Sequence, residues 1–340
     1  MKNKSPKPTI KDIAAMAKVS LRTVSLAIHG EGRMSEATRG RILKITADCG
    51  YRPNIMARGL ASGRTYLLGV VLPFVNISFY DDVLSGIEEG CRDNFYDLIL
   101  KNSRNDPAWE RRALQRLVDR HVDGLVFYPD YRCYEAYHEI LQAGVPIVQI
   151  SGRLLELAAP CVVVDNVDGG CQATSHLIQL GHRHIAHIGR FAETSTILRL
   201  RRDGYRKALV EKGVRIDLDR YEREAVGFEE GKAAALSLLR DNPEVSAIFA
   251  ASDHTALGAI AACLELGKDV PGDVSVVGFD DLEIGRLQMA HPLTTVSQPK
   301  AELGRAAAEL VFRLMQGEKC ASVVLRPALV ARGTSAPPRQ

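Results

Sequence analysis

The chain has 340 residues, of which 46% are hydrophobic, and a formal net charge of +3. This length suits a small N-terminal domain followed by two larger lobes. There is no apolar run of about 18 residues, which excludes a transmembrane helix, and the basic N-terminus lacks the apolar stretch of a secretory signal. The seven cysteines are scattered without a CxxC motif, so we expect reduced thiols in a cytoplasmic protein.

Positive charge is concentrated at the N-terminus. Residues 1–62 contain twelve Lys and Arg against four Asp and Glu, a net charge of +8, so the remaining residues carry −5. Such an asymmetry is typical of a nucleic-acid-binding segment attached to a neutral or acidic domain.

Residues 9–30 predict two short helices joined by a tight turn. Thr9 and Asp12 form a capping-box pattern ahead of an apolar run, and Ser20 is the expected N-cap of the second helix. The outward arc of this second helix carries Leu21, Arg22, Ser25, Leu26 and His29. Two such short helices bury little by themselves, and we expect the outward arc to enter the major groove of DNA.

A third helix is expected after Ser35, its N-cap, and before Gly50, with Ala37, Ile42, Ile45, Thr46 and Cys49 on its inner face. Asn54 then predicts the start of a helix of one to two turns, followed by a linker at residues 62–64. Gly59 within this helix costs about 1 kcal/mol relative to alanine. We therefore expect the helix to form only when other groups hold it, as a switchable hinge requires.

From residue 66 onward, apolar strands alternate with helices. The expected strands are residues 66–73, 97–103, 122–129, 146–151, 161–165, 184–189, 245–251, 273–280 and 322–330. The expected helices are residues 80–94, 107–120, 133–143, 169–180, 198–212, 228–240, 255–266 and 300–316. This alternation predicts parallel sheets in two similar α/β lobes, with a ligand site beyond the carboxyl ends of the strands.

Several long motifs closely resemble the lactose-repressor (LacI/GalR) family of bacterial transcription regulators. They are KDIAAMAKVSLRTVSLAIHG, MSEATRGRILKITADCGYRPNIMARGL, HLIQLGHRHIAHIG, DVSVVGFDD and PLTTVSQP, and the resemblance covers nearly all of residues 9–333. It implies an all-α helix-turn-helix headpiece followed by an α/β periplasmic-binding-protein-like core of two parallel-sheet lobes.

The resemblance also implies domain limits. The headpiece is expected at residues 1–53, the hinge helix and linker at 54–64, and the core at 65–340. The N-lobe would comprise about 65–161 and 292–319, and the C-lobe about 162–290 and 321–333. Chain crossings between the lobes are expected near residues 161–164, 289–293 and 318–322.

For DNA, the resemblance implies that Leu21, Arg22 and Leu26 face base edges. Arg22 is suited to a bidentate contact with guanine. Leu26 stands where the family usually has arginine, and His29 where it commonly has asparagine, so we expect a non-standard operator half-site. Phosphate or groove contacts are implied for Thr9, Ser25, Arg33, Ser35, Thr38, Tyr51 and Asn54, although each could be a solvated surface residue.

The hinge helix contributes two further DNA-binding candidates, Ala57 and Leu60. Leu60 matches the family's hinge leucine, which enters the minor groove of DNA and opens a central base step. The alternative for Leu60 is an ordinary interface leucine.

For a small-molecule effector, the resemblance implies a site between the lobes. Its candidate residues are Phe79, Tyr80, Asp165, Arg199, Arg201, Ser252, Asp253 and Asp280. Aromatic, arginine and aspartate side chains favour a polyhydroxylated ligand such as a sugar, and a nucleobase is the alternative.

The sequence contains no convincing catalytic, metal or nucleotide-binding site. His182, His184 and His187 enter a strand, on which His184 and His187 would point to opposite faces, so no zinc site is expected. Asp280 and Asp281 lack a nucleophile placed by a motif, and no dinucleotide or phosphate-binding motif is present.

We therefore expect a homodimeric, ligand-controlled repressor that binds operator DNA, without catalytic residues, metal, cofactor or membrane contact. The chain continues into no heptad helix after residue 330, which favours a dimer over a tetramer. A solute-binding protein is the alternative of a different class, and it predicts a signal peptide and no basic headpiece.

Overall fold

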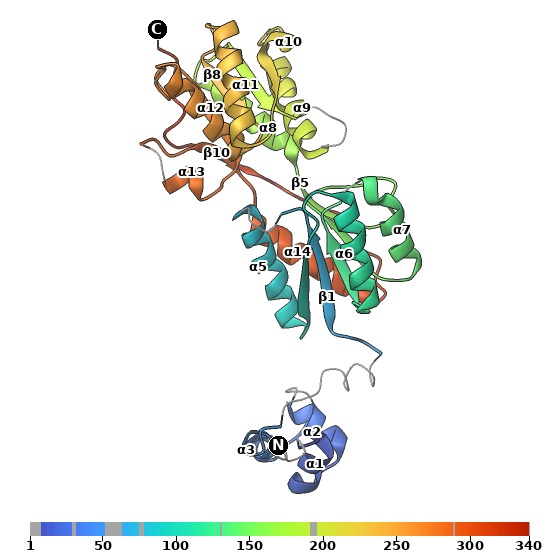
Figure 1. Cartoon of the computed structure of the whole chain (residues 1–340). Helices are drawn as coiled ribbons and strands as arrows, with labels where there is room; N and C mark the ends of the chain where they lie inside the picture. The colour runs from blue at the N-terminus through green and yellow to red at the C-terminus, as the bar shows by residue number, and fades with distance from the viewer. Residues whose placement is uncertain are drawn as a thin grey trace, which may run out of the picture. The chain divides into compact units, whose positions relative to one another are not determined.

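The computed structural model describes residues 8–28, 32–51, 63–74, 78–129, 131–190, 196–287 and 290–339 (Figure 1). The chain divides into two compact units at Tyr66 and Leu67. The described part of the first unit is helical, and the second unit contains two β-sheets covered by helices. The predicted fold class is therefore confirmed. The predicted hinge helix lies outside the described residues.

Three helices form the headpiece: α1 (Ile10–Ala17), α2 (Leu21–Ile28) and α3 (Glu36–Asp48). Thr9 makes the predicted capping box, in which Asp12 N donates to Thr9 Oγ1 at 3.4 Å and Thr9 N donates to Asp12 Oδ2 at 2.7 Å. Ser20 accepts a hydrogen bond from Thr23 N at 3.1 Å. These caps satisfy N–H groups that have no partner within the helix, so the helices begin where the sequence predicted.

The headpiece core is small. Its buried residues are Ile13, Ala14, Ala17, Val24, Ala27 and Ile42. Ser35 caps α3 as predicted, and Gly50 follows its end with a φ of 60°. Ala37 is exposed, and its predicted inner position is wrong. Ala37 and Ile42 are five residues apart, about 140° around the helix axis, so they do not share one face of α3.

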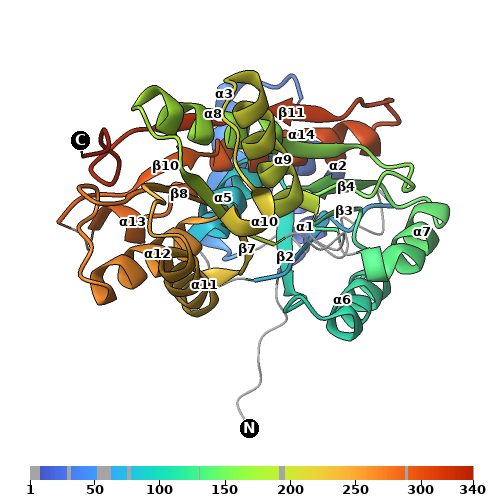
Figure 2. The same cartoon turned by 90° about the horizontal axis from the view of Figure 1, so that it is seen from above.

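The first lobe contains a parallel sheet with strand order β11-β5-β4-β3-β1-β2. Its strands are β1 (Leu67–Leu72), β2 (Asp97–Asn102), β3 (Gly124–Phe127), β4 (Ile147–Ile150), β5 (Cys161–Val164) and β11 (Val323–Leu325). Its helices are α5 (Ser78–Asp93), α6 (Pro107–Asp119), η1 (Tyr131–Cys133), α7 (Tyr134–Gln142) and α14 (Lys300–Met315). Figure 2 shows α14 on one side of this sheet and α6 and α7 on the other. Helices on both faces explain why the central strands are continuous apolar runs.

The second lobe contains a sheet with strand order β12-β10-β9-β8-β6-β7, parallel except for β12, which is antiparallel to β10. Its strands are β6 (Ile185–Gly189), β7 (Glu222–Glu224), β8 (Ala247–Ala250), β9 (Ser275–Asp280), β10 (Thr294–Ser297) and β12 (Ala328–Val330). Its helices are α8 (Asn166–Gln179), α9 (Thr196–Glu211), α10 (Leu218–Tyr221), α11 (Gly227–Asp241), α12 (Asp253–Glu265) and α13 (Ile284–Leu287). The sequence did not predict β7, β10, α10 or α13.

All three predicted crossings between lobes are placed too early. β5 pairs with β4 and β11, so the chain leaves the first sheet after Val164. β10 belongs to the second sheet, whereas α14 packs on the first lobe, so the second crossing lies at residues 298–299. An apolar run does not reveal which sheet completes its hydrogen bonds, and this is why the limits were misplaced.

The predicted last strand, residues 322–330, is two strands in different sheets. β11 pairs with β5 of the first sheet and β12 pairs with β10 of the second. The third crossing therefore lies at Arg326 and Pro327. The second lobe also extends beyond residue 333, because Thr334 Oγ1 accepts from Thr294 N at 2.9 Å and donates to Val276 O at 2.7 Å.

Candidate DNA-binding surface and effector site

The first turn of α2 presents two of the predicted base-reading residues. Leu21 and Arg22 are exposed, whereas Val24 and Ala27 are buried in the headpiece core. Ser25 is half-buried. Arg22 and Leu21 are therefore accessible to solvent at the N-terminal end of α2, where the helix dipole is positive.

Leu26 has a packing role that the sequence did not reveal. It is half-buried, and a Cβ atom at Gly32 would lie 2.9 Å from Leu26 Cδ1. Arg39 Nη2 donates to Gly32 O at 3.2 Å. Leucine therefore supports the loop between α2 and α3, and its contact with a DNA base stays a prediction.

Three of the residues predicted to contact phosphates belong to helix caps. Thr9 and Ser35 cap α1 and α3, and Thr38 Oγ1 lies 2.9 Å from Ser35 Oγ. Hydrogen bonds from the backbone and hydroxyl of Thr9 lower the pKa of Asp12. These hydroxyls are exposed or half-exposed at helix N-termini, where the backbone favours anions.

Two other candidates differ in accessibility. Arg33 is exposed, whereas Tyr51 is half-buried against the headpiece core, where burial raises its pKa. The remaining DNA-binding candidates lie outside the described residues: His29, Asn54, Ala57 and Leu60.

An open hollow of about 610 Å³ between α1 and the start of α2 was not identified from the sequence. It is lined by Lys11, Ala14, Ala15, Lys18, Val19, Ser20 and Leu21. Two lysines beside a helix N-terminus form a phosphate-attracting surface. Lysines on helix surfaces are common, so the sequence alone gave no reason to select them.

In the second lobe, Arg201 and Asp280 form a buried ion pair beyond the carboxyl ends of the strands. Arg201 Nη1 lies 3.1 Å from Asp280 Oδ1, and the two side chains are 6% and 15% exposed. Arg201 also donates to Asn166 Oδ1 at 2.9 Å and to Ala251 O at 2.6 Å. Its guanidinium carbon lies 3.7 Å from the centre of the Phe279 ring. The structure thus brings together two residues that were predicted from separate motifs.

The backbone of Asp280 and a hydrogen bond from Gln298 fix the orientation of its carboxylate. Asp280 ends β9 with a φ of 113°, which L-residues rarely adopt. Gln298 Nε2 donates to its Oδ1 at 2.7 Å. Burial raises the pKa of Asp280, and the positive charge of Arg201 opposes this rise. Backbone strain of this kind gathers at functional sites.

Phe79 and Tyr80 supply the predicted aromatic pair. Their ring centres lie 5.1 Å apart at 89°, an edge-to-face contact, and both side chains are buried. Burial raises the pKa of Tyr80, and negative charge on Tyr128 and Asp280 raises it further. The influence of the Asp280 charge on this pKa indicates that Tyr80 of the first lobe and Asp280 of the second lie within electrostatic range of each other.

Three other predicted effector residues accept hydrogen bonds from backbone N–H groups. Asp253 is fully buried, and its oxygens accept hydrogen bonds from Leu282 N at 2.6 Å and Thr295 Oγ1 at 2.5 Å. Ser252 and Asp165 are the N-caps of α12 and α8. In this structure the Asp253 carboxylate is fully buried and engaged with Leu282 and Thr295, and its contact with an effector stays a prediction.

Arg199 lies on another face of α9 than Arg201. It is exposed on α9, and two residues along a helix differ by about 200° in direction. Its predicted help to Arg201 is therefore not supported by the structure.

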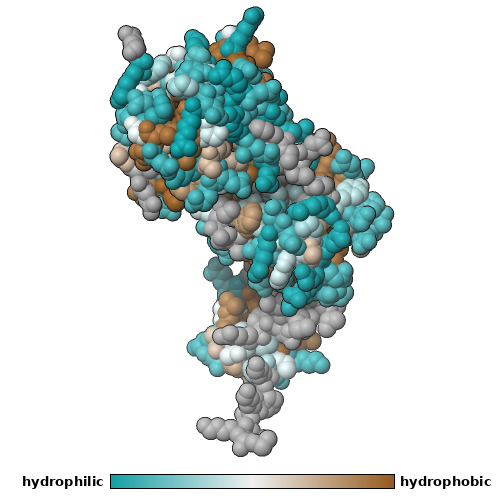
Figure 3. Space-filling model, turned by 45° about the horizontal axis from the view of Figure 1, so that its top comes forward, coloured by the Kyte–Doolittle hydropathy of each residue, from teal (hydrophilic) through white to brown (hydrophobic). Residues whose placement is uncertain are grey.

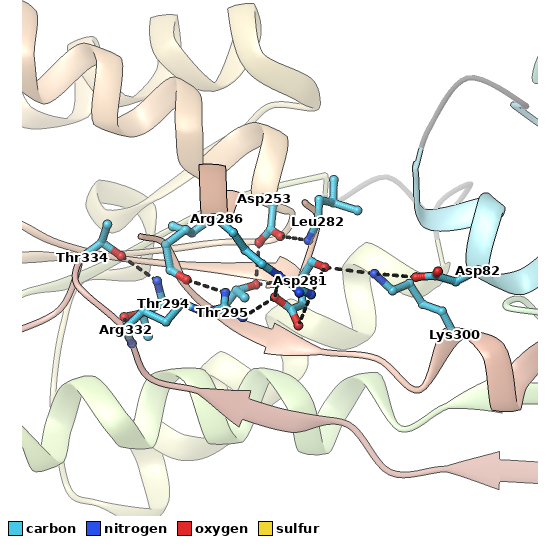
Figure 4. A network of polar contacts seen from close by, with 11 residues as sticks. Asp82, Asp253, Asp281, Leu282, Arg286, Thr294, Thr295, Lys300, Arg332 and Thr334 are labelled. Carbon is cyan, nitrogen blue, oxygen red and sulfur yellow. Dashed lines mark hydrogen bonds and ion pairs between the residues drawn. The ribbon is translucent and has the colours of Figure 1, made fainter. Parts of the chain in front are cut away.

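Asp281 joins three segments of the chain (Figure 4). Its carboxylate lies 3.0 Å from Arg286 Nη2 and 2.6 Å from Arg332 Nη2. Burial acts to raise the pKa of Asp281, but the hydrogen bond from Arg332 and the two positive charges hold it below the usual value. Lys300 Nζ donates to Asp281 O at 3.0 Å and lies 3.4 Å from Asp82 Oδ2 on α5. Lys300 begins α14 of the first lobe, so it links the lobes directly.

Three residues of this region were not predicted from the sequence: Asn166, Gln298 and Lys300. Asn166 begins α8 directly after β5, and Gln298 follows β10. Polar residues that follow parallel strands are the expected signal of a site. Lys300 carried no such signal, because its position depends on where α14 packs.

We predict that Asp253→Asn changes how stability depends on pH. Burial raises the pKa of Asp253 to about 7, far above the value of a carboxyl in an unfolded chain. Folding therefore keeps a proton that the unfolded chain loses, so this residue lowers the free energy of unfolding progressively between about pH 4 and pH 7. Thermal unfolding of both proteins from pH 5 to pH 8 should show the variant gaining stability relative to the unaltered chain as pH rises. A constant difference would contradict the assignment.

Comparisons with known proteins agree with this architecture. A model of bacterial regulatory proteins of the lacI family matches residues 9–54, and a periplasmic binding protein-like domain matches residues 174–335. The chain is 35% identical over 337 residues to the HTH-type transcriptional regulator DegA of Bacillus subtilis, which covers 97% of this chain and 99% of the relative. It is 33% identical over 326 residues to the ribose operon repressor of Haemophilus influenzae, at 95% and 97% coverage.

The chain belongs to the lacI family of bacterial regulatory proteins. Among solved structures, the Lac repressor dimer bound to operator and the anti-inducer ONPF has a TM-score of 0.81 and 27% identity, covering 97% of this chain and 100% of that chain. The complex of the transcriptional regulator CelR with cellobiose has a TM-score of 0.72 and 31% identity, covering 96% and 99%. This LacI-family protein is therefore a transcriptional repressor and not an enzyme.

The histidines of this LacI-family protein have separate partners. His182 lies 2.9 Å from Ser246 Oγ, His184 lies 2.8 Å from the Tyr221 hydroxyl, and His187 Nδ1 lies 3.0 Å from Phe249 O. Burial lowers the pKa of His187 to about 4. Within the described ranges, no three His, Cys, Asp or Glu residues could hold a metal ion together, and no helix is long and apolar enough to cross a membrane.

Proposed function

We propose that this LacI-family protein is a cytoplasmic homodimer whose affinity for operator DNA is controlled by a small carbohydrate bound between the lobes. The observation that carries the effector part is the buried pair of Arg201 and Asp280, to which Tyr80 of the other lobe lies close. A ligand that replaced or extended these contacts would connect both lobes. It would thereby bias their relative position, which is what control of DNA affinity requires.

A sugar suits this group of side chains. An oriented carboxylate accepts hydrogen bonds from hydroxyl groups, a guanidinium donates to ring or hydroxyl oxygens, and an aromatic ring packs against the C–H face of a sugar. Two similar proteins agree with this choice: the transcriptional regulator CelR in its complex with cellobiose, and the ribose operon repressor of Haemophilus influenzae. A nucleobase or another non-sugar metabolite is the second candidate, since Phe79 and Tyr80 could also stack on a planar ring.

The DNA part of the proposal rests on the headpiece. Arg22 and Leu21 lie exposed on the N-terminal turn of α2, where they could contact DNA bases. Lys11 and Lys18 line the hollow next to it, and we assign them to phosphates of the same groove. Affinity for duplex DNA should then fall steeply between about 50 mM and 200 mM salt, because several phosphates are neutralised. An affinity that is absent, or unchanged with salt, would refute this part.

The homodimer is supported by exposed apolar residues on three helices of the second lobe. They are Val226 and Phe228 around the start of α11, Leu264 on α12, and Ile284 and Leu287 on α13, with exposed fractions from 39% to 70%. Figure 3 shows apolar surface on the left side of this lobe, the side on which Figure 1 labels α12 and α13. Exposed apolar surface that gathers on one side of a lobe is typical of a subunit interface. Two half-sites would then be spaced by the two-fold symmetry of the dimer.

We predict that Phe228→Asp weakens the dimer by at least tenfold. The substitution places a charge in the proposed apolar interface, where it would be desolvated without a partner. Sedimentation over a concentration series measures the monomer–dimer equilibrium. Val210→Asp on α9 is the matched control, since Val210 is 80% exposed on another helix and should not alter the equilibrium. An unchanged equilibrium for Phe228→Asp would place the interface elsewhere.

The effector proposal is tested by thermal unfolding of the full-length protein in the presence of sugars, sugar phosphates and nucleobases. A stabilising compound is then titrated against operator binding. A sugar that raises the unfolding temperature and also changes operator affinity supports the proposal. If only nucleobases do both, the second candidate replaces it. A sugar that stabilises the protein without altering DNA binding would contradict the regulatory role.

A further inference from the structure

An exposed tryptophan on the first lobe has no role in either site described above. Trp109 is the only tryptophan in the chain, and its side chain is 44% exposed on α6. The buried face of this helix is formed by Glu110, Ala113, Leu114 and Leu117. Trp109 therefore contributes little to the core, although large aromatic side chains usually occupy the interior or an interface.

Two arginines cover the tryptophan ring. The guanidinium carbons of Arg104 and Arg112 lie 4.4 Å and 4.9 Å from the ring centre. Arg112 lies one turn further along α6, and its Nε donates to Ala108 O at 3.1 Å. The indole thus holds two cations at the surface through its π electrons.

The backbone near Arg104 is unusual. Arg104 and Asn105 have φ values of 55° and 53°, so two successive L-residues adopt the left-handed region. Arg104 N donates to Asn102 Oδ1 at 2.8 Å, and Arg132 Nη2 donates to Asn105 O at 3.1 Å. These contacts hold the loop in the conformation that places the Arg104 side chain over Trp109. Strain of this kind persists where a function requires the geometry.

The surface around the tryptophan is strongly cationic. We call it the Trp109 patch and define it by Trp109, Arg104, Arg111, Arg112 and Arg116, all exposed. Nearby carboxylates are engaged elsewhere, since Asp106 accepts from Ala108 N and Trp109 N, and Asp119 accepts from Gln115. Within the part of the chain that the structure describes, no ion pair joins an arginine of the patch to a carboxylate.

We propose that the Trp109 patch binds an acidic segment of a second protein. Arginine forks pair with carboxylates in a bidentate manner, and the indole offers apolar area to a neighbouring side chain. The patch contains arginine and tryptophan without lysine, which is the composition of energetic centres in protein–protein contacts. A second copy of this chain does not suit it, because in a two-fold contact the four arginines would face their own equivalents.

Trp109 itself provides the measurement, because as the only tryptophan it dominates the emission of the full-length protein. The probe is a synthetic twelve-residue peptide of Asp, Glu and Leu, compared with a peptide in which Asn and Gln replace the acids. We expect the acidic peptide to change Trp109 fluorescence in a saturable way that 0.5 M NaCl reverses, and the neutral peptide to cause no change. Arg104→Gln and Arg112→Gln should each weaken binding at least fivefold, whereas Arg240→Gln, at an exposed position on α11, should not.

Four results would overturn the proposal. The first is no response to the acidic peptide, and the second is an equal response to the neutral one. The third is unchanged peptide affinity in the Arg104 and Arg112 variants while their thermal unfolding matches that of the unaltered protein. The fourth is a response to non-operator duplex DNA, or to protein concentration alone, that matches the response to the acidic peptide, since this would assign the patch to nucleic acid or to a second copy.

Discussion

Arg201→Ala is expected to abolish effector binding and to destabilise the core by about 3–5 kcal/mol, the usual effect of leaving one partner of a buried ion pair unpaired. Arg201 donates to Asn166 and Ala251 and pairs with Asp280, so its loss leaves a buried carboxylate and two buried acceptors. Thermal unfolding measures the destabilisation, and calorimetric titration with the compound found by screening measures the binding.

A double variant separates folding from binding. Arg201→Met with Asp280→Asn removes both charges of the pair, so we expect it to recover most of the lost stability while still failing to bind the effector. Arg199→Ala is the matched control on the same helix, and its exposed side chain should affect neither property. Retention of full effector affinity in Arg201→Ala would exclude this pair as the effector site.

Arg22→Ala is expected to weaken operator binding about 5- to 150-fold, which corresponds to the roughly 1–3 kcal/mol of a bidentate guanine contact. Arg22 is exposed on the first turn of α2 and outside the headpiece core, so folding and effector binding should be unchanged. The operator is obtained by selecting duplexes from a random pool with the unaltered protein, and affinities are then measured for selected and unrelated duplexes.

The comparison variant is Lys18→Ala, in the neighbouring hollow. A phosphate contact should weaken selected and unrelated duplexes alike and reduce the salt slope by about 1. Arg22→Ala should instead lose affinity for the selected duplex and keep its affinity for unrelated DNA. Equal losses on both duplexes for Arg22→Ala would make Arg22 a phosphate contact and leave base reading to other residues.

In the headpiece, the starts of the helices could be predicted from the sequence because helix caps depend on residues close together in the chain. The capping box of Thr9 and Asp12 and the caps at Ser20 and Ser35 were confirmed, because each involves residues only three positions apart. Leu26 shows the limit of the same reasoning. Its helical position was predicted correctly, but its contact with the Gly32 backbone depends on how the following loop returns.

In the core, the strands that carry the site could be predicted, and the geometry of the site could not. Asp280 and Arg201 were recognised as candidates, and their 3.1 Å pairing required the folded arrangement of β9 and α9. Asp253 was a candidate too, yet it is fully buried with both oxygens engaged by the backbone of Leu282 and the hydroxyl of Thr295. A motif shows that an aspartate lies near a site and does not show which way its carboxylate points.

By itself, the sequence determined that this LacI-family protein has a basic helix-turn-helix headpiece and two α/β lobes. These features follow from periodicity, capping and charge, which act over a few residues. Only the tertiary structure decided which sheet takes β5, β10 and β11, how Lys300 links the lobes, and that Arg104 lies over Trp109. Those outcomes depend on hydrogen bonds and packing between residues far apart in the chain, where many pairings satisfy the same apolar pattern.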